Sequence, residues 1–298
     1  MTIKQIIKKV TDKDNFTSLQ GYYTFCEMYL YYVAENIQAI IVSKNENQYH
    51  FYQYKKEADF QVTRPINSNL MYDANNFEKN LNVFVEMLRS IKQSHTIKKD
   101  ALIINNVVYT IQQSIGAALD ALPAGKSNMA RKINGDLFER FIRLLINEIG
   151  IDCRSGVVQM PVLERNKELF TMSYQHDLII EKNAELKIIG SVKTSSKDRL
   201  DKIFIDKFLY NKLTEHNTPH IAIFLNDVQR KNTRKENEFG INSTFLPGHF
   251  KGYTVKLNPL DGVYYCDIRP NMQTDSILKK HIKSFDNLLT KDIWNLIK

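Results

Sequence analysis

The segment from residue 174 to residue 194 constrains the fold more than any other part of the chain. It reads YQHDLII, a polar turn at KNAE, and LKIIGSVKT, and the alternation on both sides of the turn predicts a β-hairpin. A helix is predicted for DRLDKIFIDKFLYNKLTEH, which Pro219 ends, and HIAIFL is typical of a short buried strand. This succession of strand, helix and strand predicts an α/β fold, with a mixed sheet flanked by helices.

The remaining elements are predicted from apolar spacing. Helices are expected over residues 16–37, 76–93, 100–122 and 276–297, a hairpin at AIIVS, KNEN and YHFYQY, and a strand at VVQMPVL. The basic segment LPAGKSNMARKINGD is interpreted as a loop, with Gly135 leading into an amphipathic helix, DLFERFIRLLINEIG. A polar loop is expected after Val228. We therefore expect an N-terminal helical and hairpin region over residues 1–98, of open role, and a main domain over residues 99–298.

Charge and cysteine usage narrow the class of partner and the compartment. The chain has 41 Lys and Arg against 33 Asp and Glu, a net charge of +8, which favours a polyanionic partner. Cys26, Cys153 and Cys266 are scattered and odd in number, which argues against a disulfide framework and against a zinc ribbon. No apolar leader opens the sequence, and the longest apolar run, residues 28–34, is far too short to span a bilayer. We expect a cytoplasmic protein without a membrane partner.

Two local patterns are rejected as sites. AGKSN contains GKS, but a phosphate-binding loop needs a glycine five residues before Gly125, where Asp120 stands. His216 and His220 are four residues apart, but Pro219 between them prevents a shared helical face, so a zinc site is not expected.

The residues that can carry chemistry lie in the hairpin predicted at residues 174–194. Asp177 is in one strand, while Ser191 and Lys193 are in the other, on one face because strand side chains alternate. A carboxylate beside a lysine can hold a divalent cation while the ammonium orients or helps to deprotonate a water. Phosphodiester hydrolysis needs a metal, an activated water and stabilised phosphate charge.

One carboxylate is a poor Mg²⁺ site, because Mg²⁺ prefers several hard oxygen ligands. Asp206, thirteen residues after Lys193, and Glu139, on the earlier amphipathic helix, are the candidate additional acids. The alternatives stay open: Asp206 pairing with Lys202 or Lys207 on its helix surface, and Glu139 pairing with Arg143 at i,i+4. In the same way, Asp177 could simply terminate a strand beside a turn, and Lys193 could be a solvated strand lysine.

These residues resemble the motif of the PD-(D/E)XK nuclease superfamily, and more narrowly of type II restriction endonucleases. HD at 176–177 corresponds to the family's PD. SVK at 191–193 is similar to the EcoRII-like and NgoMIV-like branch, whose middle acid has moved to the next helix. Asp206 matches that relocated position, with Asp in place of the usual Glu, and GDLFERF resembles the helix whose acid, here Glu139, supports the metal. The resemblance covers residues 131–230 and implies a nuclease domain over residues 99–298.

The resemblance also implies a DNA-reading segment. KTSSKDR is similar to the basic and acidic run with which that branch reads C·G pairs, and its chemistry suits guanine and cytosine edges. The candidates are Ser195, Ser196, Lys197, Asp198 and Arg199. A charge cluster at a helix N-terminus is the alternative. Lys126, Arg131 and Lys132 are candidates for phosphate contacts, with solvated charge as their alternative.

The function implied is Mg²⁺-dependent, sequence-specific hydrolysis of double-stranded DNA that leaves 5′-phosphate and 3′-hydroxyl ends. A homodimer is expected, because two-fold symmetric sites suit two-fold symmetric proteins. A cognate DNA methyltransferase is expected in the host as a functional partner. The other classes left open are a structure-specific or repair nuclease on this fold and a non-catalytic DNA-binding module.

Overall fold

The computed structural model describes residues 1–55, 62–95, 100–165, 167–197, 199–235 and 237–298. The chain forms two compact units. The first comprises residues 1–88, 98–141 and 227–244, and the second comprises residues 89–97, 142–226 and 245–298. The domain boundary predicted near residue 98 stays a prediction. None of the described helices is both long enough and apolar enough to cross a membrane.

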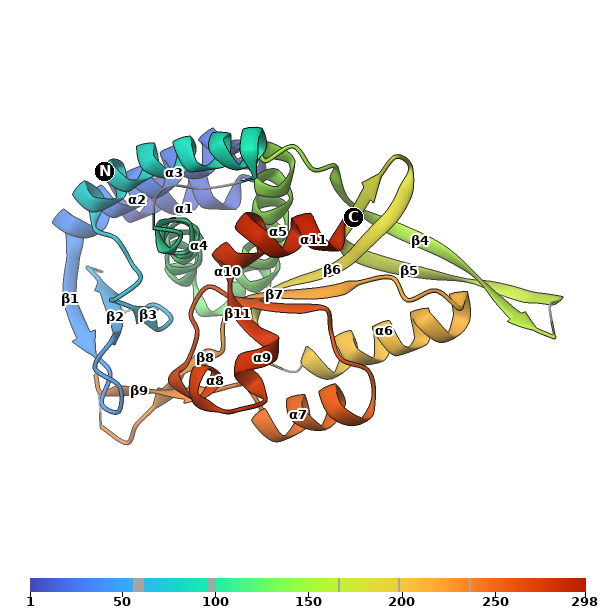
Figure 1. Cartoon of the computed structure of the whole chain (residues 1–298). Helices are drawn as coiled ribbons and strands as arrows, with labels where there is room; N and C mark the ends of the chain where they lie inside the picture. The colour runs from blue at the N-terminus through green and yellow to red at the C-terminus, as the bar shows by residue number, and fades with distance from the viewer. Residues whose placement is uncertain (56–61, 96–99, 166, 198, 236) are drawn as a thin grey trace. The chain divides into compact units, whose positions relative to one another are not determined.

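The first unit packs helices around a buried central helix (Figure 1). Its elements are α1 (Ile3–Thr11), η1 (Lys13–Phe16), α2 (Leu19–Asn36), β1 (Ile37–Val42), β2 (Tyr49–Tyr54), β3 (Ile66–Asn67), α4 (Leu102–Asp120), η2 (Ala124–Lys126), β8 (Val228–Asn232) and β9 (Phe239–Ser243), with most of α3 (Ala74–Ser94) and α5 (Ser127–Glu148). The helix α4 is the central one, with nearly every residue between Ile104 and Leu119 buried. The predicted hairpin of β1 and β2 is confirmed.

Two elements of this unit differ from the sequence prediction. The helix α5 begins at Ser127, so residues 127–136 are helical and the predicted loop is wrong there. The segment after Val228 is the antiparallel hairpin β8–β9 and not a polar loop. The Asn45 side chain also pairs with the backbone of Ile241 in β9, accepting from its N–H at 2.8 Å and donating to its carbonyl at 3.0 Å.

The second unit is built on a six-stranded mixed sheet with the order β11-β10-β7-β6-β5-β4. Its strands are β4 (Cys153–Glu164), β5 (Lys167–Lys182), β6 (Glu185–Ser195), β7 (His220–Asn226), β10 (Gly262–Tyr265) and β11 (Ile282–Ser284). The strands β4, β5 and β6 are antiparallel, whereas β6, β7, β10 and β11 are parallel. The predicted hairpin at residues 174–194 is confirmed as β5–β6, and HIAIFL forms the wholly buried β7.

Helices cover one face of this sheet. They are α6 (Leu200–Thr214), α7 (Pro247–Lys256), α8 (Pro270–Thr274) and α9 (Leu278–His281). Phe204 and Phe250 of these helices pack in one cluster with Phe224 and Tyr265 of the sheet. On the opposite face, Tyr264 donates a hydrogen bond at 2.9 Å to Asp292, which lies in the π-helical turn η3 (Leu288–Asp292).

The predicted single helix over residues 276–297 is wrong. The strand β11 interrupts it after α9, and α10 (Phe285–Asn287), η3 and α11 (Ile293–Leu296) follow. Ile282 pairs with Val263 of β10, so a place at the sheet edge overrides the helical spacing of the apolar residues.

Candidate active site

The candidate site lies where β5 and β6 separate. The two strands pair from Lys182 and Glu185 as far as Leu178 and Gly190. Beyond that point β6 continues beside β7, as far as the pair of Ser195 with Asn226. Meanwhile β5 continues only beside β4. Asp177 is the first residue of β5 past this fork, directly after the last paired step at Leu178 and Gly190.

The carboxylate of Asp177 is bound from β6. Its Oδ2 accepts a hydrogen bond from Lys193 Nζ at 2.6 Å and another from the Val192 N–H at 2.8 Å. The side chains of Asp177 and Lys193 are 17% and 29% exposed, so the ion pair is only partly open to solvent. Because partial burial weakens solvent screening, this pair is held more firmly than a surface ion pair.

A β-bulge in the pairing of β5 with β4 lies at Asp177. On the side of β4, Arg154 pairs with Ile179 but Gly156 pairs with His176, so β5 has one extra residue between these pairs. Bulges re-aim side chains and occur often beside active sites. Simple alternation predicted that Asp177, Ser191 and Lys193 lie together. The structure brings Asp177 and Lys193 into contact, as this alternation predicts.

Ser191 and Lys193 share the helix-covered face of the sheet. They pair in register with Ala222 and Phe224 of β7, which pack in the cluster that includes α6. Side chains in register on paired strands point to the same face. Ser191 is half-buried there, beside the strand position of Asp177.

Arg143 is a neighbour of the site that the sequence did not identify. Its Nη1 lies 3.4 Å from the backbone carbonyl oxygen of Asp177, to which it donates a weak hydrogen bond. Arg143 stands four residues after Glu139, and this spacing suggested only an i,i+4 ion pair between the two side chains. A single sequence does not show that an arginine on an amphipathic helix contacts a residue in a distant strand.

Asp206 lies on α6 and forms the ion pair with Lys202 that was the alternative to a metal role, at 2.5 Å. Its side chain is 19% exposed and that of Lys202 is 66% exposed. Asp206 also acts on His176: burial lowers the pKa of this histidine, while the charges of Asp206 and Asp177 oppose that effect. Both carboxylates are therefore close enough to His176 to influence its charge.

The other candidate acid and the metal site remain predictions. Glu139 is half-buried on α5 in the first unit, whereas Asp177 belongs to the second. Within the residues that the structure describes, no three His, Cys, Asp or Glu side chains are grouped to hold a metal ion.

The candidate DNA-reading run links β6 to α6. Ser195 ends β6, and its Oγ accepts the Lys197 N–H at 3.2 Å. Ser196 is buried, Lys197 and Arg199 are exposed, and Arg199 is the residue before the first turn of α6. Asp198 lies outside the described residues. The turn therefore presents basic side chains to solvent at the end of the strand that carries Lys193.

The candidate phosphate contacts lie on helical turns. Lys126 ends η2, and Arg131 and Lys132 are exposed on the first turns of α5. Their side chains are available to a partner, although on a helix and not in the predicted loop.

The architecture is that of the restriction-endonuclease fold. The chain resembles the crystal structure of the type IIP restriction endonuclease Kpn2I with a TM-score of 0.72 and 17% identity, over 99% of this chain and 97% of that chain. A weaker likeness joins it to the complex of restriction endonuclease PspGI with substrate DNA, at a TM-score of 0.43 and 12% identity, over 74% and 92% of the two chains. No protein-family model and no curated protein matches the sequence. The α/β restriction-endonuclease fold predicted from the sequence is confirmed.

Proposed function

We propose that the protein is a type II restriction endonuclease that hydrolyses double-stranded DNA at a specific sequence and depends on Mg²⁺. The observation that carries this proposal is the Asp177–Lys193 pair at the fork of β5 and β6, on a fold shared with Kpn2I along nearly the whole chain. An acid and a lysine in contact at a strand fork supply a metal ligand and a cation beside one reacting phosphate.

The residues present suit Mg²⁺ in kind. Asp177 would hold the ion through its carboxylate, whose two hydrogen bonds from β6 both end on Oδ2. Asp206 is the candidate second ligand, since its partner Lys202 is largely exposed and can turn to solvent. Mg²⁺ keeps several waters and binds through one or two carboxylates plus substrate phosphate, so a large protein cage is not required. When bound, the ion would lower the pKa of a water and neutralise phosphate charge.

The chain's own groups would do the positioning. The Val192 N–H holds the Asp177 carboxylate in place, and Arg143 restrains the Asp177 backbone. Lys193 would release Asp177 to the cation and direct its ammonium to the attacking water or to the phosphate oxygens. Hydrolysis of the bond between phosphorus and the 3′ oxygen would leave 5′-phosphate and 3′-hydroxyl ends.

Recognition is proposed for the turn between β6 and α6. Lys197 and Arg199 are exposed there and Asp198 stands between them in sequence, so donors and an acceptor for base edges follow the catalytic strand directly. Lys126, Arg131 and Lys132 would contact phosphates. A homodimer would match a two-fold symmetric site, and a cognate methyltransferase would protect the host DNA.

The test is digestion of a phage-sized DNA with the purified protein and Mg²⁺, followed by sequencing of the ends. We expect discrete bands with 5′-phosphate ends, and cleavage at least about 100-fold slower for Lys193→Met and for Asp177→Asn. Asp201→Asn, an exposed acid on the first turn of α6, is the matched control and should cut like the parent.

Other digestion results would favour one of the two alternative functions. A smear, or cutting only at branched DNA, would favour a structure-specific or repair nuclease. A salt-dependent mobility shift without cleavage would favour a DNA-binding module. Full activity of both site variants would remove Asp177 and Lys193 from the active site.

A further inference from the structure

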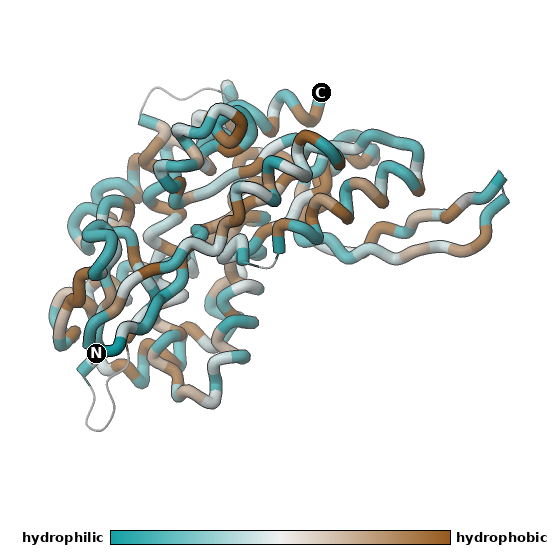
Figure 2. Tube along the Cα trace, turned by 90° about the horizontal axis from the view of Figure 1, so that it is seen from below, coloured by the Kyte–Doolittle hydropathy of each residue, from teal (hydrophilic) through white to brown (hydrophobic). Residues whose placement is uncertain are grey.

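The two-stranded ribbon that β4 and β5 form beyond the fork is the feature that the proposed chemistry leaves unused. Its pairs run from Gly156 and His176 out to Glu164 and Lys167. Over this stretch, the described residues of β4 and β5 pair only with each other. In both Figure 1 and Figure 2 this ribbon projects from the rest of its unit. A two-stranded ribbon is at best marginally stable alone in water, so its outer part gains from a partner.

The inner half of the ribbon packs against α6, whereas the described apolar side chains of the tip are exposed. Halfway along the ribbon, Met160 is 1% exposed and packs with Tyr210 of α6, with Val158 and Tyr174 around them. At the tip, Leu169 and Phe170 are each 54% exposed. The apolar side chains that α6 covers thus give way, within a few residues, to apolar side chains that meet solvent.

A second bulge lies at the tip of the ribbon. Val162 pairs with Phe170 and the next pair joins residues 163 and 168, so Leu169 is the extra residue of a bulge. Bulges re-aim side chains at the ends of strands. Two consecutive apolar side chains, both more than half exposed, form a compact anchor of the type that fills a pocket on a partner.

The charge of the tip argues against DNA as that partner. Residues 159–173 contain two acids, Glu164 and Glu168, and two bases, Arg165 and Lys167, so they carry no net charge in a chain of net charge +8. Proteins bind the DNA backbone by neutralising phosphates with lysine and arginine, and the tip has no such excess.

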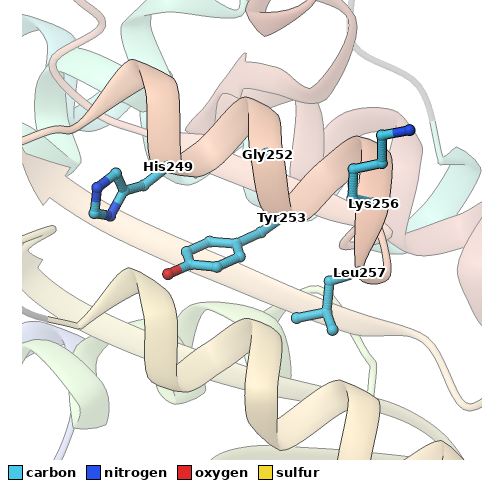
Figure 3. Close-up of a pocket in the computed structure, with 5 residues that line it drawn as sticks. All are labelled: His249, Gly252, Tyr253, Lys256 and Leu257. Atoms are coloured by element: carbon cyan, nitrogen blue, oxygen red, sulfur yellow. The ribbon is translucent and has the colours of Figure 1, made fainter.

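A surface of matching chemistry lies on α7 of the same unit. A pocket of about 440 Å³ is lined by His249, Gly252, Tyr253, Lys256 and Leu257 (Figure 3). His249, Tyr253 and Leu257 are spaced four residues apart and therefore form one stripe of the helix. Figure 3 shows their side chains on the side of α7 that faces the neighbouring helix, where the Tyr253 ring lies 5.4 Å from that of Phe204.

The pocket suits the tip in polarity as well. Its walls are mostly apolar, and the Lys256 ammonium stands at one side, away from the other side chains (Figure 3). A carboxylate of the tip, such as that of Glu168, could pair with this ammonium while Phe170 enters the apolar part. In Figure 1 the tip lies far from α7 of the same chain, so the contact must come from another molecule.

We propose that the tip of the β4–β5 ribbon of one copy docks into the α7 pocket of a second copy, and that this exchange of ribbons holds the homodimer. This contact would form the homodimer of the proposed function and so rests on it, but dimerisation is measured without DNA cleavage. The two ideas can therefore fail separately.

Sedimentation equilibrium of the full chain without DNA tests the proposal first. We expect a dimer for the parent and at least a 10-fold weaker dimer for Phe170→Asp, as befits loss of an aromatic anchor. Ile40→Asp is the matched control, since it adds the same charge to an exposed strand residue of the first unit. Circular dichroism establishes that all three proteins are folded.

Cysteine cross-linking identifies the surface. Cys26, Cys153 and Cys266 are buried, so new surface thiols react in their place. Phe170→Cys protein mixed with Leu257→Cys protein should form a disulfide-linked dimer on mild oxidation. A monomeric parent, a Phe170→Asp protein that dimerises like the parent, or a link only between two Phe170→Cys chains overturns the proposal. So does a Phe170→Asp protein that keeps its dimer and loses DNA affinity, because the tip would then be a DNA contact.

Discussion

At the scale of single residues, a closely packed glycine lies beside the candidate site. Gly190 pairs with Leu178 at the last step before the strands separate. A Cβ atom placed on Gly190 would lie 3.0 Å from Leu178 Cδ1 and 3.1 Å from Ile221 Cγ1, closer than ordinary packing. Glycine therefore lets β5, β6 and β7 lie close together directly behind Asp177 and Lys193.

For this reason Gly190→Ala should destabilise the protein by about 1–3 kcal/mol, the usual cost of overpacking. The measurement is urea unfolding followed by circular dichroism. Gly125→Ala is the control, because nothing lies within 4 Å of its Cβ position. Equal stability of the two variants would show that the strands can move apart at Gly190 without cost.

We expect the buried His220 to make the stability of the protein depend on pH. It is 3% exposed at the start of β7, and its Nδ1 lies 2.8 Å from the Thr218 carbonyl oxygen. Burial, and to a lesser degree the charge of Lys207, lowers the pKa of His220 to about 4, although the Thr218 contact opposes this. The unfolded chain, with a pKa near 6.5, therefore binds this proton first.

Stability from the neutral His220 should be complete above about pH 6.5 and should fall as the pH drops toward 4, below which this slope ends. The free energy of unfolding in urea, measured from pH 7.5 to pH 4, tests this. His220→Asn should flatten the slope, while His216→Gln, at an exposed position, should leave it unchanged. A slope that is the same in His220→Asn would assign the pH dependence to other groups.

At the scale of elements, α5 shows why helix ends are hard to predict. The pattern of small and basic residues before Gly135 favoured a loop, yet the helix runs from Ser127 through Gly135 to Glu148. Ala130 and Ile133 are buried, so tertiary packing stabilises these turns in spite of poor helix formers. The first unit thereby extends the helix beyond its amphipathic part.

Gly135→Ala should then stabilise the protein by about 0.5–1 kcal/mol, because Gly135 lies inside a helix and nothing stands within 4 Å of its Cβ position. Thermal unfolding should show a raised midpoint. A lowered midpoint would indicate that the helix does not pass through residue 135 in solution.

At the scale of the whole molecule, the structure shows where some of the basic residues behind the net charge of +8 lie. Exposed basic residues lie at the start of α5 and in the turn before α6. Arg230, which falls in the polar loop expected after Val228, instead donates to the Val62 carbonyl at 2.7 Å and lies over the Phe239 ring. Its charge therefore joins segments of the first unit.

The double variant Arg131→Ala with Lys132→Ala should reduce DNA affinity for all sequences alike. If both side chains contact phosphates, the slope of log K against log salt should become shallower by about 2, near 0.9 for each contact. Fluorescence anisotropy across a salt series measures it, with Lys79→Ala on α3 as an exposed control. An unchanged slope would remove both residues from the interface.

The sequence by itself determined the hairpin, the helix after it and the buried strand β7, because alternation and apolar spacing there are strong and local. It also placed Asp177 and Lys193 on adjoining strands, which supports the resemblance from which the fold was predicted. The tertiary structure alone decided the bulge at Asp177, the contact from Arg143 and the strand β11 inside a helical pattern. Each of these depends on which distant segment lies alongside, and that pairing is set by packing over long separations that local spacing does not encode.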